Sequence, residues 1–322
     1  MKFRRHHFLI LLAGAVLLGS WGFFAHKTIN RLAVFTLPEP LIGFYKQNID
    51  YLTENATSAD KRRYSDPNEA PRHYIDLDHF EQTLPVDTMP IFWKEACAKY
   101  TEDTLKAYGI VPWHINFKIR ELTQAFKDKN KERILRLSAD LGHYIGDAHV
   151  PLHACENYDG QMTGQKGIHG FWESRLPELF YNQYDFFVGS AEYLDSPFYS
   201  VWKAVEQSFD ARDSVLRFER ELNRQFEEDK KYTLQQKGTN TVKAYSEAYS
   251  KAYHDMLNGM VERRMRASIK LVGSIWYTCW VNAGQPDLGP VSDTPLDATQ
   301  QKLLEEEEQQ YKNGKIIGRP EQ

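Results

Sequence analysis

The sequence predicts an all-α protein with a single, mostly helical domain, and three observations support this. Apolar side chains recur at helical spacing along most of the chain. With 322 residues, of which 42% are hydrophobic, the chain is long enough and apolar enough to bury a large core. There is no internal repeat, which leaves one large domain or two small ones, and we expect one.

The net charge excludes a basic surface that binds duplex DNA. The formal charge is -4, and it becomes -7 once the three cations Lys2, Arg4 and Arg5 of the leader are removed. A nucleic acid would therefore have to be held by metal ions or by a local pocket.

Residues 1–20 have the pattern of a signal peptide. Residues 2–7 are basic, residues 8–18 are apolar but too few for an ordinary membrane span, and Gly19-Ser20 is a small-residue junction. We expect cleavage before Trp21 and export to the periplasm or the medium. An uncleaved anchor is the alternative, because Leu18 is a mediocre residue three positions before the cut.

The domain is expected to span residues 21–290. A short amphipathic helix begins near His26 and ends before Pro38, and helical spacing resumes over residues 41–59. The stretch 60–73 is polar and reads as a loop, which can carry functional residues on a rigid scaffold. Helical patterns follow at 92–108 and 117–126, separated by Gly109.

Residues 131–149 form the predicted central helix. Both of its faces are largely apolar, and Gly142 and Gly146 allow another helix to approach closely. His143 and Asp147 are therefore expected inside the protein. A buried carboxylate without a partner is costly, which argues for a bound cation.

The segment 143–173 predicts a metal site. Two His-x-x-x-carboxylate pairs each place two donors on one helical face, and Pro151 ends the central helix so that His153 can fold back between them. Pro177 is expected to stop the second, shorter helix. The alternative is a set of separately satisfied core histidines and helix ion pairs. The candidate ligands are His143, Asp147, His153, His169 and Glu173.

The three cysteines do not hold the fold together, because their number is odd and the core is large. Cys155 follows His153 by two residues and is either a zinc ligand or, the favoured reading, a small buried side chain or half of a disulfide. Cys97 and Cys279 are the others.

The last third predicts long helices at 208–228 and 240–276, the second broken at Gly259 or Gly273. The domain ends near Pro286. Residues 291–322 form a charged tail that we expect to be solvated or disordered.

The candidate ligands resemble those of the superfamily that contains the bacterial zinc-dependent phospholipases C and the fungal single-strand-specific zinc nucleases (the S-one and P-one nucleases). In that superfamily a mature N-terminal Trp, a nearby His, a loop Asp, a second His, and a His-x-x-x-Asp-x-x-x-x-x-His segment followed by His-x-x-x-Asp/Glu bind three zinc ions. The resemblance covers about residues 21–180 in detail. Its members here are Trp21, His26, Asp60, His73, His143, Asp147, His153, His169 and Glu173.

The resemblance implies the superfamily's helical fold, three Zn²⁺ ions per chain and a division of the ligands among them. Asp60, His73, His143 and Asp147 would hold one ion; His153, His169 and Glu173 a second; and Trp21, His26 and the other oxygen of Asp147 a third. Asp60 could also orient the attacking water as a catalytic base.

The resemblance leaves the substrate open between two classes. Arg63 and the pair Tyr74 and Asp76 match the nucleases, in which such an aromatic and acid bind a base. Glu173 and the short loop before His169 match the phospholipases, although Lys61 fits a choline pocket poorly. Lys61, Arg63, Tyr74 and Asp76 are the candidate substrate-binding residues.

The function expected from the sequence is a zinc-dependent phosphoesterase. Its substrates would be single-stranded nucleic acid or nucleotides, or phospholipid headgroups, and no stable protein partner or mature transmembrane segment is evident. The alternative is an exported, non-catalytic binding protein stabilised by zinc. The presence of Asp60, a possible base, favours the enzyme.

Overall fold

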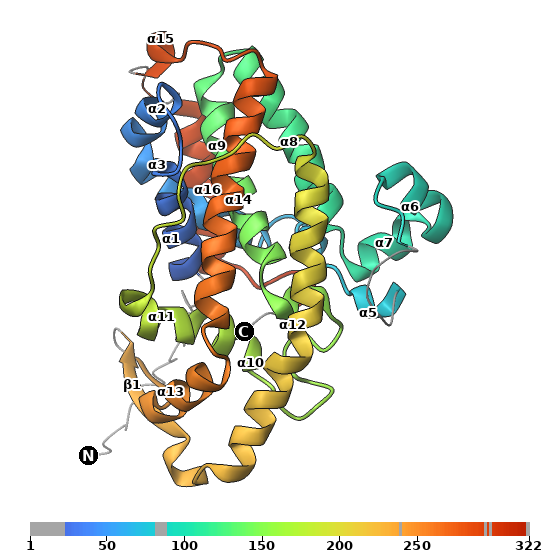
Figure 1. Ribbon diagram of the computed structural model, residues 1–322, viewed down its shortest axis with the longest axis vertical. Helices are drawn as coiled ribbons and strands as arrows, with labels where there is room; N and C mark the ends of the chain where they lie inside the picture. Colours follow the sequence, from blue (N-terminus) through green and yellow to red (C-terminus); the bar gives the residue numbers. More distant parts are fainter. Residues whose placement is uncertain (1–22, 81–88, 238–239, 293–294, 296–297, 320–322) are drawn as a thin grey trace, which may run out of the picture.

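The protein is described by a computed structural model that covers residues 23–80, 89–237, 240–292, 295 and 298–319. It is mostly helical, as predicted, with one small two-stranded sheet (Figure 1). The predicted leader and Trp21 lie outside the described residues. Among the described helices, none combines the length and apolar character needed to cross a lipid bilayer.

Most of the described helices are joined by short connections, and residues 155–167 and 184–196 form longer stretches without helix or strand. The longer helices are α1 (Phe23–Val34), α2 (Leu41–Gln47), α6 (Trp93–Tyr100), α7 (Glu102–Tyr108), α8 (Val111–Lys127), α9 (Lys131–Ala148), α12 (Pro197–Gln225), α13 (Glu247–Met256), α14 (Met260–Asn282) and α16 (Ala298–Asn313).

Shorter helical segments connect them, and a hairpin precedes α13. The short α-helices are α3 (Ile49–Glu54), α4 (Ser58–Arg62), α5 (Leu77–Phe80), α10 (Ile168–Gly170), α11 (Leu176–Phe180) and α15 (Gly289–Ser292). The 3₁₀ turns are η1 (Asn55–Thr57), η2 (Ala70–Arg72), η3 (Pro151–Ala154), η5 (Tyr181–Gln183) and η6 (Glu228–Lys230), and η4 (Phe171–Arg175) is a π-helical turn. The strands are β1 (Tyr232–Lys237) and β2 (Asn240–Tyr245).

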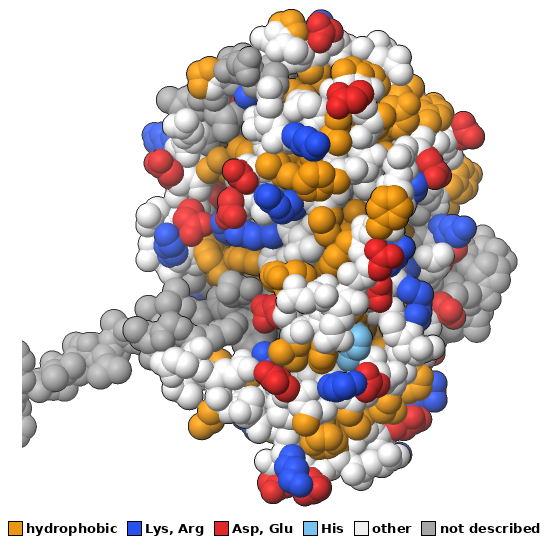
Figure 2. Space-filling model, turned by 60° about the vertical axis from the view of Figure 1, so that its left-hand side comes forward, with side chains coloured by type: hydrophobic (Ala, Val, Ile, Leu, Met, Phe, Trp, Pro, Cys, Tyr) orange, Lys and Arg blue, Asp and Glu red, His pale blue; other side chains and the backbone are white. Residues whose placement is uncertain are grey.

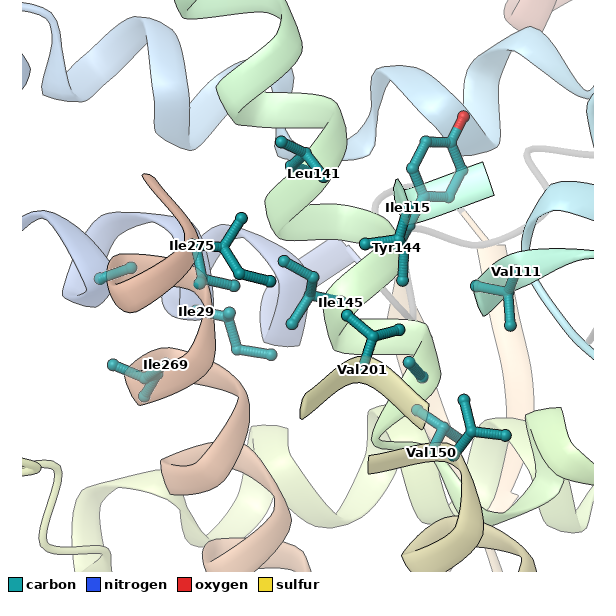
Figure 3. Close-up of a cluster of buried hydrophobic side chains, with 14 of the residues drawn as sticks. Ile29, Val111, Ile115, Leu141, Tyr144, Ile145, Val150, Val201, Ile269 and Ile275 are labelled. Atoms are coloured by element: carbon teal, nitrogen blue, oxygen red, sulfur yellow. The ribbon is translucent and has the colours of Figure 1, made fainter. Parts of the chain in front are cut away.

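Helix α9 is the central helix of the protein. Every residue from Ile134 to Ala148 except Arg136 is buried, as its two apolar faces predict. Helices α1, α8, α12 and α14 surround it (Figure 1). Figure 3 shows how Ile145 of α9 lies among Ile29, Val201 and Ile275 from three of these helices. Burial of each such side chain contributes roughly 1.5–3 kcal/mol.

The crossing of α1 over α9 depends on glycine, as predicted. A Cβ added at Gly146 would lie 2.9 Å from Nδ1 of His26. At Gly142 the space is filled by the side chain of Asn30, which donates to the carbonyl oxygen of Ala139 at 3.1 Å. Because of this contact, His26 on α1 lies against His143 on α9, with ring centroids 4.0 Å apart.

Several of the predicted limits are wrong. Helix α12 begins at Pro197 and not at residue 208, helix α8 begins at Val111 and not at residue 117, and the predicted loop 60–73 starts within α4. Pro177 does not stop the second short helix but lies in the first turn of α11, where a missing backbone N–H costs nothing. Residues 240–245 do not extend the following helix but form β2, paired antiparallel with β1. The helix break at Gly259 is confirmed, since this residue has φ +72°.

The predicted solvated tail contains an ordered helix. Helix α16 packs on α4, where Lys61 Nζ lies 2.7 Å from Glu308 Oε2. Tyr311 makes an edge contact with Tyr64 at a centroid distance of 5.0 Å. The prediction missed this because a few anchoring contacts order a helix whose other faces are charged and exposed.

On the face shown in Figure 2, basic and acidic side chains are interspersed. This mixture is consistent with the near-neutral composition and shows no extended basic patch on that face.

Candidate metal centre

The structure brings together eight of the nine predicted ligand residues, and the ninth, Trp21, lies outside the described residues. They come from six regions that are far apart in the sequence, but their donor atoms form overlapping groups within 4.8 Å. They are His26 on α1, Asp60 on α4, His73 after η2, His143 and Asp147 on α9, His153 in η3, His169 on α10 and Glu173 in η4.

The first group contains His73, His143 and Asp147, and Asp60 forms a neighbouring group with His143 and His26. Asp147 Oδ2 lies 3.0 Å from His73 Nδ1 and 3.3 Å from His143 Nε2. Asp60 Oδ1 faces the same two rings at 3.7 Å and 3.5 Å. The two ring nitrogens therefore each lie within 3.7 Å of an oxygen of Asp147 and an oxygen of Asp60.

The second group contains His153, His169 and Glu173. Glu173 Oε2 lies 2.8 Å from His169 Nε2 and 3.4 Å from His153 Nε2. His169 and Glu173 are one helical turn apart, as the sequence predicts, and the π-helical turn of η4 carries Glu173. Such turns occur frequently at functional sites.

His26 joins the two groups. Its Nε2 lies 3.3 Å from Asp147 Oδ1 and 3.2 Å from Glu173 Oε1. Asp147 therefore presents one oxygen to the first group and the other to His26. Glu173 does the same for the second group, which differs from the resemblance, where only Asp147 is shared.

Backbone carbonyls set the orientation of three of the rings. Nδ1 of His143 bonds to the Ala56 carbonyl at 2.9 Å, that of His153 to the His73 carbonyl at 2.7 Å, and that of His169 to the Tyr158 carbonyl at 3.1 Å. Since Nδ1 donates to these oxygens, Nε2 is the nitrogen of each ring that faces the cluster. This arrangement is typical of histidines that bind metals.

The charges of the cluster are strongly coupled. Burial raises the pKa of Asp147, but the charges of His143 and His153 outweigh it and hold that pKa well below its usual range. Burial likewise raises the pKa of Glu173, and hydrogen bonds from histidines lower it further than burial raises it. Burial lowers the pKa of His73, yet its bond to Asp147 and the nearby carboxylates raise it to about 9. Asp147 and Glu173 are therefore held in their ionised forms.

These residues fit a divalent metal. Asp147 is 1% exposed, and its Oδ1 has no hydrogen-bond partner, although a buried carboxylate oxygen normally has one. Imidazole nitrogens and carboxylate oxygens are the donors that Zn²⁺ takes in proteins. A cation at this position would satisfy the oxygen and displace the imidazole protons.

Sequence reasoning missed Glu69, which supports His73. Glu69 is fully buried, its Oε1 lies 3.5 Å from His73 Nε2, and it accepts a hydrogen bond from the Tyr144 hydroxyl. Arg62 and Arg72 also bond to it. The sequence does place Glu69 four residues before His73, a spacing at which two side chains can meet. We did not predict the contact because a carboxylate in a polar stretch is usually solvated.

Asp159 was also missed. Its Oδ1 accepts hydrogen bonds from the backbone N–H groups of Gly167 at 2.9 Å and His169 at 3.4 Å. Gly167 has φ +94°, a conformation that glycine adopts readily. Asp159 thereby holds the start of the turn that carries His169.

Two other residues with donor atoms, Cys155 and His149, stay outside the donor groups. Cys155 is buried, burial raises its pKa to about 12, and it forms no disulfide, nor do Cys97 and Cys279. Burial beside Arg264 lowers the pKa of His149 to about 3, and its Nδ1 bonds to the Ile145 carbonyl.

A cavity of about 610 Å³ opens onto the cluster. One part of its wall is formed by donor residues of the cluster: His26, Asp60, Asp147, His153, His169 and Glu173. The β1–β2 hairpin forms a second part, and Tyr311 and Ile316 form a third. Arg63 is the one predicted substrate residue that lines this cavity. The other three predicted substrate residues instead contact the C-terminal segment, residues 308–319. They are Lys61, Tyr74 and Asp76.

A scan against protein-family models and a search of curated proteins each found no match for this chain.

Proposed function

We propose that the protein is a zinc-dependent phosphoesterase that hydrolyses phosphodiester or phosphomonoester bonds with three metal ions per chain. The observation that carries the proposal is the buried cluster in which Asp147 and Glu173 each present two oxygens to different histidines beside an open cavity. Bound Zn²⁺ ions would supply positive charge for a phosphate and lower the pKa of water toward neutrality.

Asp60 is the side chain best placed to act on water. Its side chain is 23% exposed, whereas those of Asp147 and Glu173 are 1% and 10% exposed. It thus lies where the buried cluster meets the solvent of the cavity. We assign it the role of orienting the attacking water and accepting its proton.

The cavity also suits an anionic substrate. Lys166, Arg175 and Lys243 lie in its wall together with Arg63, so a phosphate near the cluster would have cations on several sides. Single-stranded nucleic acid or nucleotides and phospholipid headgroups both carry such a phosphate. The substrate class is therefore the first quantity to measure.

The second candidate is an exported binding protein that uses the metals for stability alone. Ion coordination would link six regions of the chain and stabilise the fold even without turnover. The exposure of Asp60 to the cavity favours the enzyme, because a purely structural site has no need of a solvent-facing carboxylate. Export and the use of the Trp21 amine as a ligand belong to the same proposal.

Activity assays on matched substrates test the proposal. The purified mature protein, loaded with zinc, is assayed on single-stranded DNA, 3′-nucleotides and phosphatidylcholine, and its metal content is measured. We expect about three zinc ions per chain and hydrolysis of one substrate class. Turnover of none of them, with the metal bound, would favour the binding protein.

Asp60→Asn separates catalysis from folding. It should keep most of the metal while lowering the rate roughly 10²–10⁴-fold, the usual contribution of a general base. The control is Asp66→Asn in the loop that follows α4, whose side chain is 33% exposed and bonds to Arg72 at 3.0 Å. Equal activity in both variants would rule out Asp60 as the base.

A further inference from the structure

The C-terminal segment, residues 308–319, contacts each of the four residues that the sequence assigns to the substrate. Glu308 bonds to Lys61 at 2.7 Å. The backbone N–H of Ile317 donates to the Arg63 carbonyl at 2.8 Å, and the Arg63 guanidinium donates to the carbonyl of Arg319. Arg319 itself contacts the other two.

Arg319 occupies a narrow slot between two aromatic rings. Its guanidinium carbon lies 4.1 Å from the centre of the Tyr74 ring and 3.5 Å from that of Tyr158. Nη1 donates to Asp76 Oδ1 at 2.6 Å, and Nη2 donates to the Cys155 carbonyl at 3.1 Å. The side chain is 9% exposed. Two ring faces and two acceptors therefore hold a flat, donor-bearing group.

The chain reaches this slot along the edge of the metal cavity. Tyr311 and Ile316 form part of the cavity wall, so the segment passes from the opening of the cavity to the slot. Gly318 turns it inward with φ +89°, and a Cβ at this position would lie 2.7 Å from Cβ of Ala70. Only glycine allows both the turn and the approach.

Between its contacts with Lys61, Arg63 and the slot, the segment is largely exposed to solvent. Residues 313–315, 317 and 318 are exposed, and α16 behind them is charged and mostly exposed. A region of this kind opens locally at a lower free-energy cost than the core. Local opening of the segment would free the slot while the helices around α9 stay folded.

We propose that residues 308–319 act as an intramolecular inhibitor, with Arg319 occupying a slot that a flat group of the substrate must enter. This inference rests on the proposed function for its effect on catalysis, but the occupation of the slot is testable without it. The flat group is one with hydrogen-bond donors on its edge, such as the base of a single-stranded oligonucleotide.

The first experiment measures the slot directly in the full-length protein. Methylguanidinium is titrated into the wild type, Arg319→Ala and the control Lys315→Ala, which removes an exposed cation from the same segment, and binding is followed by the NMR signals of the tyrosine rings. We expect saturable binding to Arg319→Ala alone. Absence of binding to a folded Arg319→Ala variant would overturn the proposal.

The second experiment measures inhibition. Hydrolysis of a single-stranded oligonucleotide should be faster in Arg319→Ala, by about tenfold in kcat/KM if the segment is closed nine-tenths of the time. Lys315→Ala should match the wild type. An unchanged or lower kcat/KM in Arg319→Ala, with methylguanidinium bound by neither protein, would show that the segment is a fixed wall.

A second variant covers the case in which Arg319→Ala misfolds. Gly318→Ala keeps the arginine but should displace it, and it should likewise admit methylguanidinium and raise kcat/KM. If no variant and no wild-type sample hydrolyses any phosphoester, the proposed function fails. The methylguanidinium result then still decides whether Arg319 occupies a binding slot.

Discussion

Asp147→Asn is expected to remove more than one metal ion. In the structure Asp147 Oδ2 faces His73 and His143 at 3.0 Å and 3.3 Å, and Oδ1 faces His26 at 3.3 Å. The substitution removes the negative charge from both positions at once. Loss of even a supporting residue typically lowers metal affinity 10–100-fold, so two weakened positions together should lose about 10²–10⁴-fold, or roughly 3–6 kcal/mol.

The group of His153, His169 and Glu173 does not use Asp147. Asp147→Asn should therefore retain about one ion per chain of an expected three. Metal content is measured by mass spectrometry after dialysis against a weak chelator, and affinities by calorimetry. Full metal content with unchanged affinity would refute the assignment of Asp147 as the shared ligand.

Asp140→Asn is the matched control for this experiment. Asp140 lies on the same helix, is 4% exposed, and bonds to Arg62 at 2.9 Å rather than to the histidines. Breaking this buried pair should lower the free energy of unfolding by up to about 3–5 kcal/mol but leave the metal content unchanged. The pair of variants thus separates loss of a ligand from loss of stability.

Two further outcomes are expected. Gly146→Ala places a methyl group 2.9 Å from His26 Nδ1 and should lower the free energy of unfolding by about 1–3 kcal/mol in thermal melts, whereas Gly43→Ala, with open space around it, should not. Burial raises the pKa of Asp76 from 3.8 to about 6, against the lowering effect of Arg319. The contribution of the Asp76 carboxyl to the free energy of unfolding is fully present below the pKa of the unfolded state and is lost as the pH rises through the pKa of the folded state. Because Arg319→Ala removes the cation that lowers this folded-state pKa, the NMR titration of Asp76 and the loss of stability should both move to higher pH. A titration of Asp76 that stays in place would contradict the pairing.

The C-terminal segment changes how the substrate residues are read. Tyr74 and Asp76 were identified through the resemblance to the nucleases, in which such an aromatic and acid stack on and hydrogen-bond a base. The structure places a guanidinium from the chain itself in that position. The chemistry expected from the residues agrees with the group found there, although its source differs from the one expected.

The sequence determined the helical class, the central helix and the identity of the residues in the donor groups. The helical class, the central helix and the donors between His143 and Glu173 follow from local rules, because apolar periodicity and His-x-x-x-carboxylate spacing each depend on a few neighbouring residues. The donors His26, Asp60 and His73 were identified only through the resemblance. His143 and Asp147 could be placed inside the protein because both faces of their helix are apolar. The ends of elements were less certain, as Pro177 and residues 240–245 show.

Only the tertiary structure decided which carboxylates face histidines of two donor groups and which segment borders the cavity. The contact of Glu173 with His26 spans 147 positions, and that of Arg319 with Asp76 spans 243. No local pattern specifies such distances, because they depend on how separate helices pack around α9. The same packing buries Glu69, so that a carboxylate from a loop supports His73. It also holds α16 against α4, so that part of the charged tail lies beside the site.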